Sequence, residues 1–148
     1  MLHARTLAHG LSPVQFEANG LMAALHELLA NIGDLFGVAC EFRCDSPVLV
    51  TDQFVATHLY RIAQEAISNA IRHGHAGHIL VSLAPDSRGA VLTVSDDGIG
   101  CATPVWESTG MGLRTMQYRS EMIGATLRIA PGAGGGTAVT CEFQTPAT

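Results

Sequence analysis

The stretch RIAQEAISNAIRHG, from Arg61 to Gly74, is the most informative part of this chain of 148 residues. It belongs to a long helical pattern that runs from about Asp52 to His73, with Gly74 in the place of a C-cap. At roughly 100° per residue, five apolar side chains share one stripe of this helix. They are Val55, Leu59, Ile62, Ala66 and Ala70.

A second stripe of the same helix is polar, because residues three or four positions apart share a face. It contains Arg61, Glu65, Asn69 and Arg72. One interpretation is a solvated face with weak ion pairs, for example between Arg61 and Glu65. The other is the lining of a functional site, and the rest of the chain must distinguish the two.

The other segments alternate between strand and helix patterns. Five read as strands: 38–44, 78–84, 90–96, 125–130 and 137–143. Two more read as helices: about 19–36 and 111–124. The turn compositions PDSRG and PGAGGG predict two hairpins. This order predicts an α+β fold, a two-layer sandwich in which a mixed, mainly antiparallel sheet packs on helices.

The composition is that of a globular domain, since 47% of the residues are hydrophobic and 14% are charged. The net charge is -5 and no basic run occurs, which argues against a nucleic-acid-binding protein. No apolar run approaches the roughly 20 residues of a membrane-spanning helix, and the start lacks the apolar centre of a signal peptide. We therefore expect a cytoplasmic domain with no nucleic-acid partner and no membrane contact.

The cysteines and histidines do not have the spacing of a metal site. Cys40 and Cys44 alternate with Val38 and Phe42 on one face of a predicted strand, and no CxxC pair includes the other two, Cys101 and Cys141. Three histidines straddle a helix end and a turn, without an HExxH motif: His73, His75 and His78. We expect small buried thiols in a reducing compartment.

Two glycine-rich segments carry further polar groups. In VLTVSDDGIG, a strand runs into Asp96 and then into flexible backbone that a ligand can approach closely, although Asp-Gly also favours a simple turn. In TGMGLRTMQYRS, Gly110 and Gly112 open a helix, and the free N–H groups of a helix N-terminus suit a phosphate. Neither a Walker A loop nor a Rossmann fingerprint is present. GGGT, 134–137, reads alone as a hairpin turn.

Together these segments resemble the GHKL-type ATP-binding domain of sensor histidine kinases, type II topoisomerases, mismatch-repair ATPases and large heat-shock chaperone ATPases. EAISNAIRH resembles the N box, DDGIG the first glycine box, GMGL the second and GGGT the last. The strongest resemblance is to histidine kinases that pair with NarL-like response regulators, where LYRIAQEAISNAIRHG is nearly a signature. It covers roughly Gly10 to Phe143 and implies a Bergerat-type ATP-binding fold.

The resemblance implies a role for each matching residue. Asp96 would accept a hydrogen bond from the adenine amine. Asn69 would bind Mg²⁺, and Glu65 would be the base or the water-orienting carboxylate beside the γ-phosphate. The remaining implied nucleotide-binding residues are Arg72 and His73 near the phosphates, Gly98 and Gly100 at the floor and lid hinge, Gly110, Gly112 and Leu113 of the second glycine box, and Thr137 beside the adenine pocket.

The same resemblance implies cofactors and partners. We expect ATP with Mg²⁺, a dimerisation domain that supplies the phosphoacceptor histidine, and a response regulator downstream. Residues 1–15 would be the end of a connector and residues 16–148 the catalytic domain. The His-acid pair His26-Glu27 lies within a predicted helix and is interpreted as an ordinary surface position. Alternatives are a serine kinase of the anti-sigma-factor type, a nucleotide-sensing module without catalysis, and a plain interaction domain.

Overall fold

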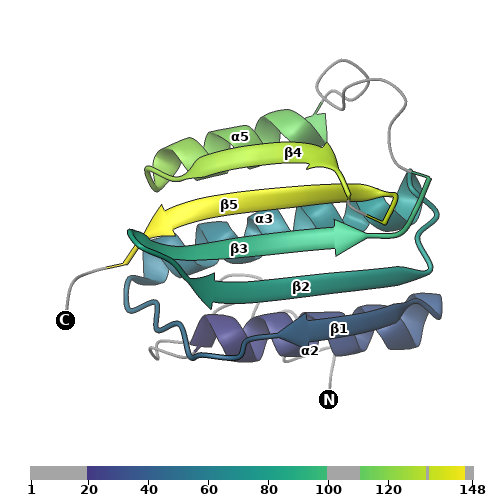
Figure 1. Cartoon of the computed structure of the whole chain (residues 1–148), viewed down its shortest axis with the longest axis horizontal. Helices are drawn as coiled ribbons and strands as arrows, with labels where there is room; N and C mark the ends of the chain where they lie inside the picture. Colours follow the sequence, from purple (N-terminus) through teal and green to yellow (C-terminus); the bar gives the residue numbers. More distant parts are fainter. Residues whose placement is uncertain (1–19, 100–110, 133, 146–148) are drawn as a thin grey trace, which may run out of the picture.

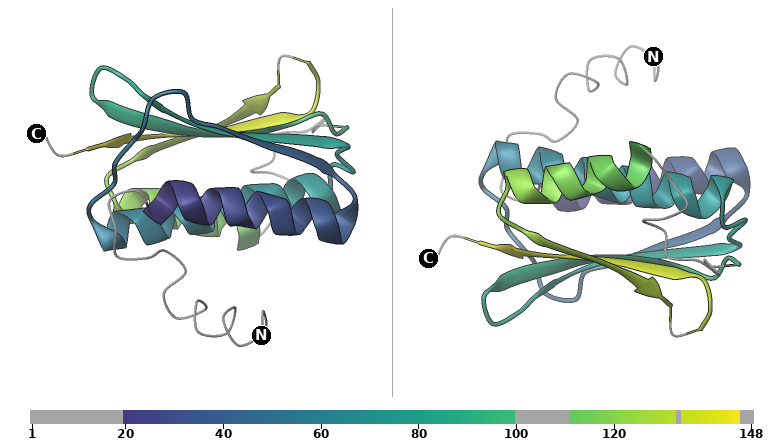
Figure 2. Two further views of the ribbon diagram at one scale, coloured as in Figure 1. Left: turned by 90° about the horizontal axis from the view of Figure 1, so that it is seen from below. Right: turned by 90° about the horizontal axis from the view of Figure 1, so that it is seen from above.

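The computed structural model describes residues 20–99, 111–132 and 134–145. Its elements are α2 (Gly20–Phe36), β1 (Ala39–Arg43), α3 (Gln53–Arg72), β2 (His78–Pro85), β3 (Gly89–Asp96), α5 (Met111–Met122), β4 (Thr126–Pro131) and β5 (Thr137–Gln144). The strands form one sheet in the order β1-β2-β3-β5-β4 (Figure 1). β1 and β2 are parallel and the other neighbours antiparallel. The three helices lie on one side of the sheet (Figure 2), so the predicted two-layer sandwich is confirmed.

The central helix α3 begins at a capping carboxylate. The Asp52 side chain accepts hydrogen bonds from the N–H groups of Phe54 at 2.9 Å and Val55 at 3.3 Å, which have no partner inside the helix. Four of the five residues of the predicted apolar stripe are buried, and Val55 is only partly buried. The buried face is also wider than expected: Ala56, Leu59, Ile62, Ala63, Ala66, Ile67 and Ala70. One face of α3 is therefore fixed in the core.

The end of α3 differs from the prediction in its conformation. The C-cap is His73, whose N–H bonds to the Asn69 carbonyl oxygen at 2.9 Å. The residue with positive φ is His75, at 50°, and not Gly74. A glycine is still required at position 74, because a β-carbon there would lie 2.9 Å from the Ala70 carbonyl oxygen. Close approach, rather than a left-handed backbone, explains this glycine.

The sheet supplies the other half of the core. Its helix-facing side chains are buried: Ile79, Val81 and Leu83 of β2, Ala90, Leu92 and Val94 of β3, and Val139, Cys141 and Phe143 of β5. Successive side chains of a strand point to opposite faces. The alternate residues therefore lie on the face that no described helix covers, which we call the open face. There the register forms a row across four strands: Glu41, Leu80, Ser95 and Ala138.

Of the three described cysteines, only Cys141 is buried as expected. Cys40 and Cys44 pack partly buried against the core, together with Val38 and Phe42. Both thiols and that of Cys141 are free, and burial raises the pKa of Cys141 to about 12. Cys101 lies outside the described residues.

Two further findings concern the helices. His26 is exposed on α2, as an ordinary surface position would be. Within the described ranges, no helix combines the length and the apolar character that crossing a membrane requires.

Candidate nucleotide-binding site

The polar stripe of α3 faces the start of α5. A β-carbon at Gly112 would lie 2.5 Å from Glu65 Oε2 and 3.6 Å from Asn69 Oδ1. The first turn of α5 therefore lies directly against these two side chains, and a larger residue at position 112 would require the Glu65 carboxylate to move. Farther along α5, Arg119 Nη1 is 3.2 Å from the ring of His58, so the two helices run side by side.

The charged groups of the stripe make contacts with one another and with neighbouring residues of α3. Arg72 Nη2 is 3.9 Å from Glu65 Oε2, and the Arg72 side chain is 63% exposed against 25% for Glu65. Such an ion pair contributes little to stability. Arg61 donates to Gln64 Oε1 at 2.9 Å. The Glu65 carboxylate is partly buried beside α5, and within the described part of the chain its ion-pair contact is this long one with Arg72.

Asp96 ends β3 on the helix-facing side of the sheet, in alternation with Val94 and Leu92. Its Oδ1 accepts a hydrogen bond from the Gly98 N–H at 2.8 Å. Gly136 lies against it so closely that a β-carbon there would overlap the Asp96 carbonyl oxygen. Thr137 opens β5, and the pairing of Ser95 with Ala138 puts Thr137 opposite Asp96.

A short junction between α3 and β2 joins these two groups of residues. The Gly74 N–H bonds to the Asn69 carbonyl oxygen at 3.2 Å, and the Gly74 carbonyl oxygen accepts from the Ile99 N–H at 2.9 Å. Gly98 packs against the same carbonyl group so closely that a β-carbon at position 98 would overlap the carbonyl oxygen. The ends of α3 and β3 and the start of α5 therefore gather at one end of the molecule (Figure 1).

The remaining predicted site residues fall into three places. Arg72 and His73 are exposed at the end of α3, and Leu113 is partly buried against the core. Gly100 and Gly110 lie outside the described residues.

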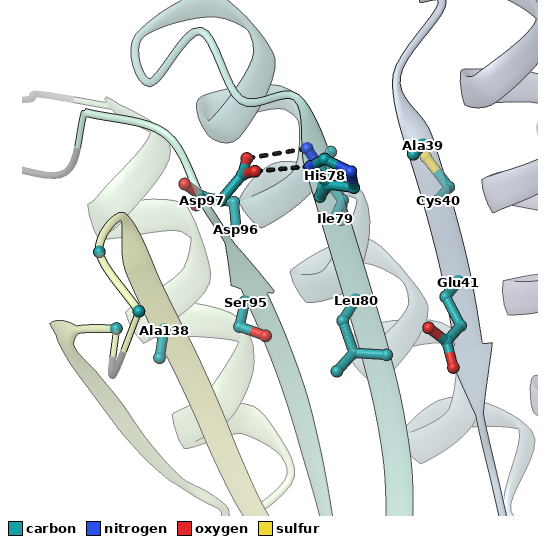
Figure 3. A pocket seen from close by; sticks show the side chains of 13 residues that line it. Ala39, Cys40, Glu41, His78, Ile79, Leu80, Ser95, Asp96, Asp97 and Ala138 are labelled. Carbon is teal, nitrogen blue, oxygen red and sulfur yellow. Dashed lines mark hydrogen bonds and ion pairs between the residues drawn. The ribbon is translucent and has the colours of Figure 1, made fainter.

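A cavity of about 640 Å³ lies on the open face, away from the helices (Figure 3). It is bordered by Glu41, Leu80, Ser95 and Ala138, by glycines of the β4–β5 turn, and by Asp96 and Asp97. The Asn69 amide does not line this cavity. The cavity is therefore distinct from the nucleotide site that the motifs predict beside Asn69, although it reaches the same end of β3.

Sequence reasoning assigned no role to Asp97, and the structure gives it several contacts. Its Oδ1 accepts from the N–H groups of Gly77 at 2.9 Å and His78 at 2.8 Å. Its Oδ2 is 2.6 Å from His78 Nδ1 (Figure 3). The available signal was the Asp-Asp pair itself, since adjacent strand residues point to opposite faces.

These contacts favour the charged form of Asp97. Hydrogen bonds from the backbone and then the side chain of His78 lower the pKa of Asp97, and the Gly77 N–H acts in the same direction. A pKa below its unfolded-state value means that the contacts contribute to stability at neutral pH. That contribution is lost only when the pH falls below the ordinary range of an aspartate.

Solved structures identify the class of fold. The ATP binding domain of PrrB from Mycobacterium tuberculosis aligns with a TM-score of 0.73 at 18% identity, over 88% of this chain and 96% of that one. The histidine kinase domain from Erythrobacter litoralis EL346 aligns with a TM-score of 0.73 at 19% identity, over 93% and 68%. The fold is that of histidine kinase ATP-binding domains.

Residues 54–147 match the family described as histidine kinase-, DNA gyrase B-, and HSP90-like ATPase, and the chain belongs to this family. Among its relatives, the nitrate/nitrite sensor protein NarQ of Escherichia coli K12 is 35% identical over 84% of this chain. The sensor histidine kinase LiaS of Bacillus subtilis 168 is 31% identical over 96% of it. The chain spans only 22% of NarQ and 38% of LiaS. The resemblance stated from the motifs is confirmed.

Proposed function

We propose that this chain is the ATP-binding catalytic domain of a sensor histidine kinase. It would bind Mg-ATP and donate the γ-phosphoryl group to a histidine on a separate dimerisation domain. Relatives that are named sensor histidine kinases support this function. The structural observation that carries it is the first turn of α5 against Glu65 and Asn69, because it brings the N-terminal end of a helix to an amide and a carboxylate.

Each group has a task suited to its chemistry. An ionised Asp96 is only an acceptor, so it selects adenine, which offers an amine there, over guanine. Gly98, Thr137 and the Asp96 carboxylate would form the purine end of the site. The N-terminal turn of α5 presents N–H groups and the positive end of the helix dipole to the phosphates.

The donor set at α3 fits Mg²⁺. Asn69 Oδ1 and the Glu65 carboxylate are oxygen donors one helical turn apart, and both face Gly112. Mg²⁺ prefers oxygen ligands and usually takes only one or two from the protein, with phosphate oxygens and waters completing its shell. When bound, the ion supplies charge neutralisation on the phosphates. Asn69 would hold it, and Glu65 would orient the attacking group beside the γ-phosphate.

The surroundings of the domain follow from the same proposal. Residues 16–148 would form the catalytic domain, and residues 1–15 the end of a connector from the dimerisation domain. A response regulator would receive the phosphoryl group. We place the domain in the cytoplasm, where ATP is available.

Asn69→Ala should abolish the enhancement of ATP binding by Mg²⁺ while retaining part of the affinity for the adenine end. The reason is that the amide oxygen is the proposed metal ligand and Asp96 is untouched. Calorimetry of ATP binding with Mg²⁺ and with EDTA measures this. Ser68→Ala, one position earlier and about 100° around the helix, is the control. An Mg²⁺ enhancement in Asn69→Ala equal to that of wild type would remove the ligand role.

Glu65→Gln should leave ATP affinity near wild type and slow phosphoryl transfer about tenfold, equivalent to about 1.4 kcal/mol in the barrier. Glutamine keeps the size of the side chain but loses its charge. The measurement is transfer from labelled ATP to the dimerisation domain of a relative, supplied separately. Glu121→Gln on the exposed side of α5 removes the same charge elsewhere and should transfer normally. Equal rates for both variants would take Glu65 out of the chemistry.

A further inference from the structure

The two aspartates that end β3 lie on opposite sides of the sheet. Asp96 faces the helices, where the adenine end of the proposed site lies. Asp97 follows it, and its carboxylate turns toward His78 over the open face (Figure 3). Asp97 is therefore next to the recognition residue in the chain but does not reach the same side of the sheet.

The contacts of Asp97 tie the end of β3 to the start of β2. The carboxylate accepts hydrogen bonds from two backbone N–H groups and pairs with one ring nitrogen, at distances of 2.6 to 2.9 Å. The Asp97 N–H also bonds to the His78 carbonyl oxygen at 3.2 Å. All these partners belong to Gly77, the last residue between α3 and β2, and to His78, the first residue of β2.

The turn after Asp96 is held at a second point by the same junction. The Ile99 N–H bonds to the Gly74 carbonyl oxygen, and Gly98 packs on that carbonyl. The Gly98 N–H in turn donates to Asp96 Oδ1. The orientation of the Asp96 carboxylate thus depends on the position of Gly98. Gly98 is held in place on one side by the contacts of Asp97 and on the other by the hydrogen bond of Ile99 to Gly74.

We propose that Asp97 is a positioning residue for adenine recognition, which fixes the Asp96 carboxylate by anchoring the turn to Gly77 and His78. This inference rests on the proposed function. Asp97 itself does not touch the nucleotide. Because the same junction is bonded to the Asn69 carbonyl, the anchor also sets how far the purine end of the site lies from the phosphate end.

The test compares Asp97→Ala with Asp97→Asn by calorimetry with ATP and with GTP. Alanine removes all side-chain contacts and should lower ATP affinity about tenfold, within the range for lost hydrogen bonds, with little change for GTP. Asparagine keeps an oxygen that accepts both backbone N–H groups, so it should restore most of the preference for ATP. Mg²⁺ enhancement should be unchanged in both variants.

Asp86→Ala is a matched control at the other end of the same hairpin. Asp86 Oδ1 accepts from the N–H groups of Arg88 at 2.9 Å and Gly89 at 2.8 Å. Asp86→Ala should lower the melting temperature by about as much as Asp97→Ala does, without changing the ratio of ATP to GTP affinity. An equal change of that ratio in Asp86→Ala and Asp97→Ala would overturn the positioning role, as would wild-type preference in Asp97→Ala. Failure of the wild type to bind ATP would instead overturn the proposed function and this inference with it.

Discussion

Asp96→Ala should lower the affinity for ATP by about 10- to 150-fold, because a hydrogen bond to a charged group contributes about 1.5–3 kcal/mol. The carboxylate ends β3 on the helix-facing side, already oriented by the Gly98 N–H. No other described carboxylate is placed opposite Thr137 in this way. Calorimetric titration with ATP measures the loss, and the affinity for GTP should change little.

Asp96→Asn separates charge from shape. Asparagine retains an acceptor oxygen, but that oxygen must serve both the Gly98 N–H and the adenine amine without the negative charge. We expect an intermediate affinity. Asp45→Ala removes an exposed carboxylate far along the chain and serves as the charge control. ATP affinity equal to wild type in both Asp96 variants would show that the purine is recognised elsewhere.

The periodic parts of the fold could be predicted from the sequence because each has a buried face. The stripe of Leu59, Ile62 and Ala66 has a helical period and is buried in α3. The two hairpins alternate and are bounded by turn residues, and both formed as expected. Where burial imposes a pattern on the residues, the pattern identifies the element.

The details that complete the candidate site depend on contacts between distant segments, which no local pattern records. Gly112 is explained by Glu65, 47 positions earlier in the chain, and Asp97 by Gly77 and His78. The helix end shows the same limit, since Gly74 was expected as the C-cap, whereas the C-cap is His73 and the positive φ is at His75. Motif spacing identified which segments matter, while three-dimensional packing determined the task of each residue.

Gly136→Ala should destabilise the domain by about 3 kcal/mol, which corresponds to a fall of about 10 °C in melting temperature at this chain length. Two effects add. The residue has φ of 72°, where a β-carbon is strained, and that atom would overlap the Asp96 carbonyl oxygen. The obstacle is backbone of β3, so a side-chain rotation cannot relieve it. Because Asp96 itself must shift, ATP affinity should fall as well.

The neighbouring glycines separate the two causes. Gly134 has no positive φ, and apart from its chain neighbours no atom of the described residues lies within 4 Å of a β-carbon there, so Gly134→Ala should stay within about 0.5 kcal/mol of wild type. Gly135 has φ of 99° but open space, so Gly135→Ala should show the backbone strain alone and bind ATP normally. Thermal unfolding should therefore find Gly134→Ala the most stable of the three variants and Gly136→Ala the least stable. Calorimetry should find a loss of ATP affinity only in Gly136→Ala. Equal losses at 135 and 136 in both measurements would mean that the contact with Asp96 contributes nothing, and that the β4–β5 turn does not support the purine end of the site.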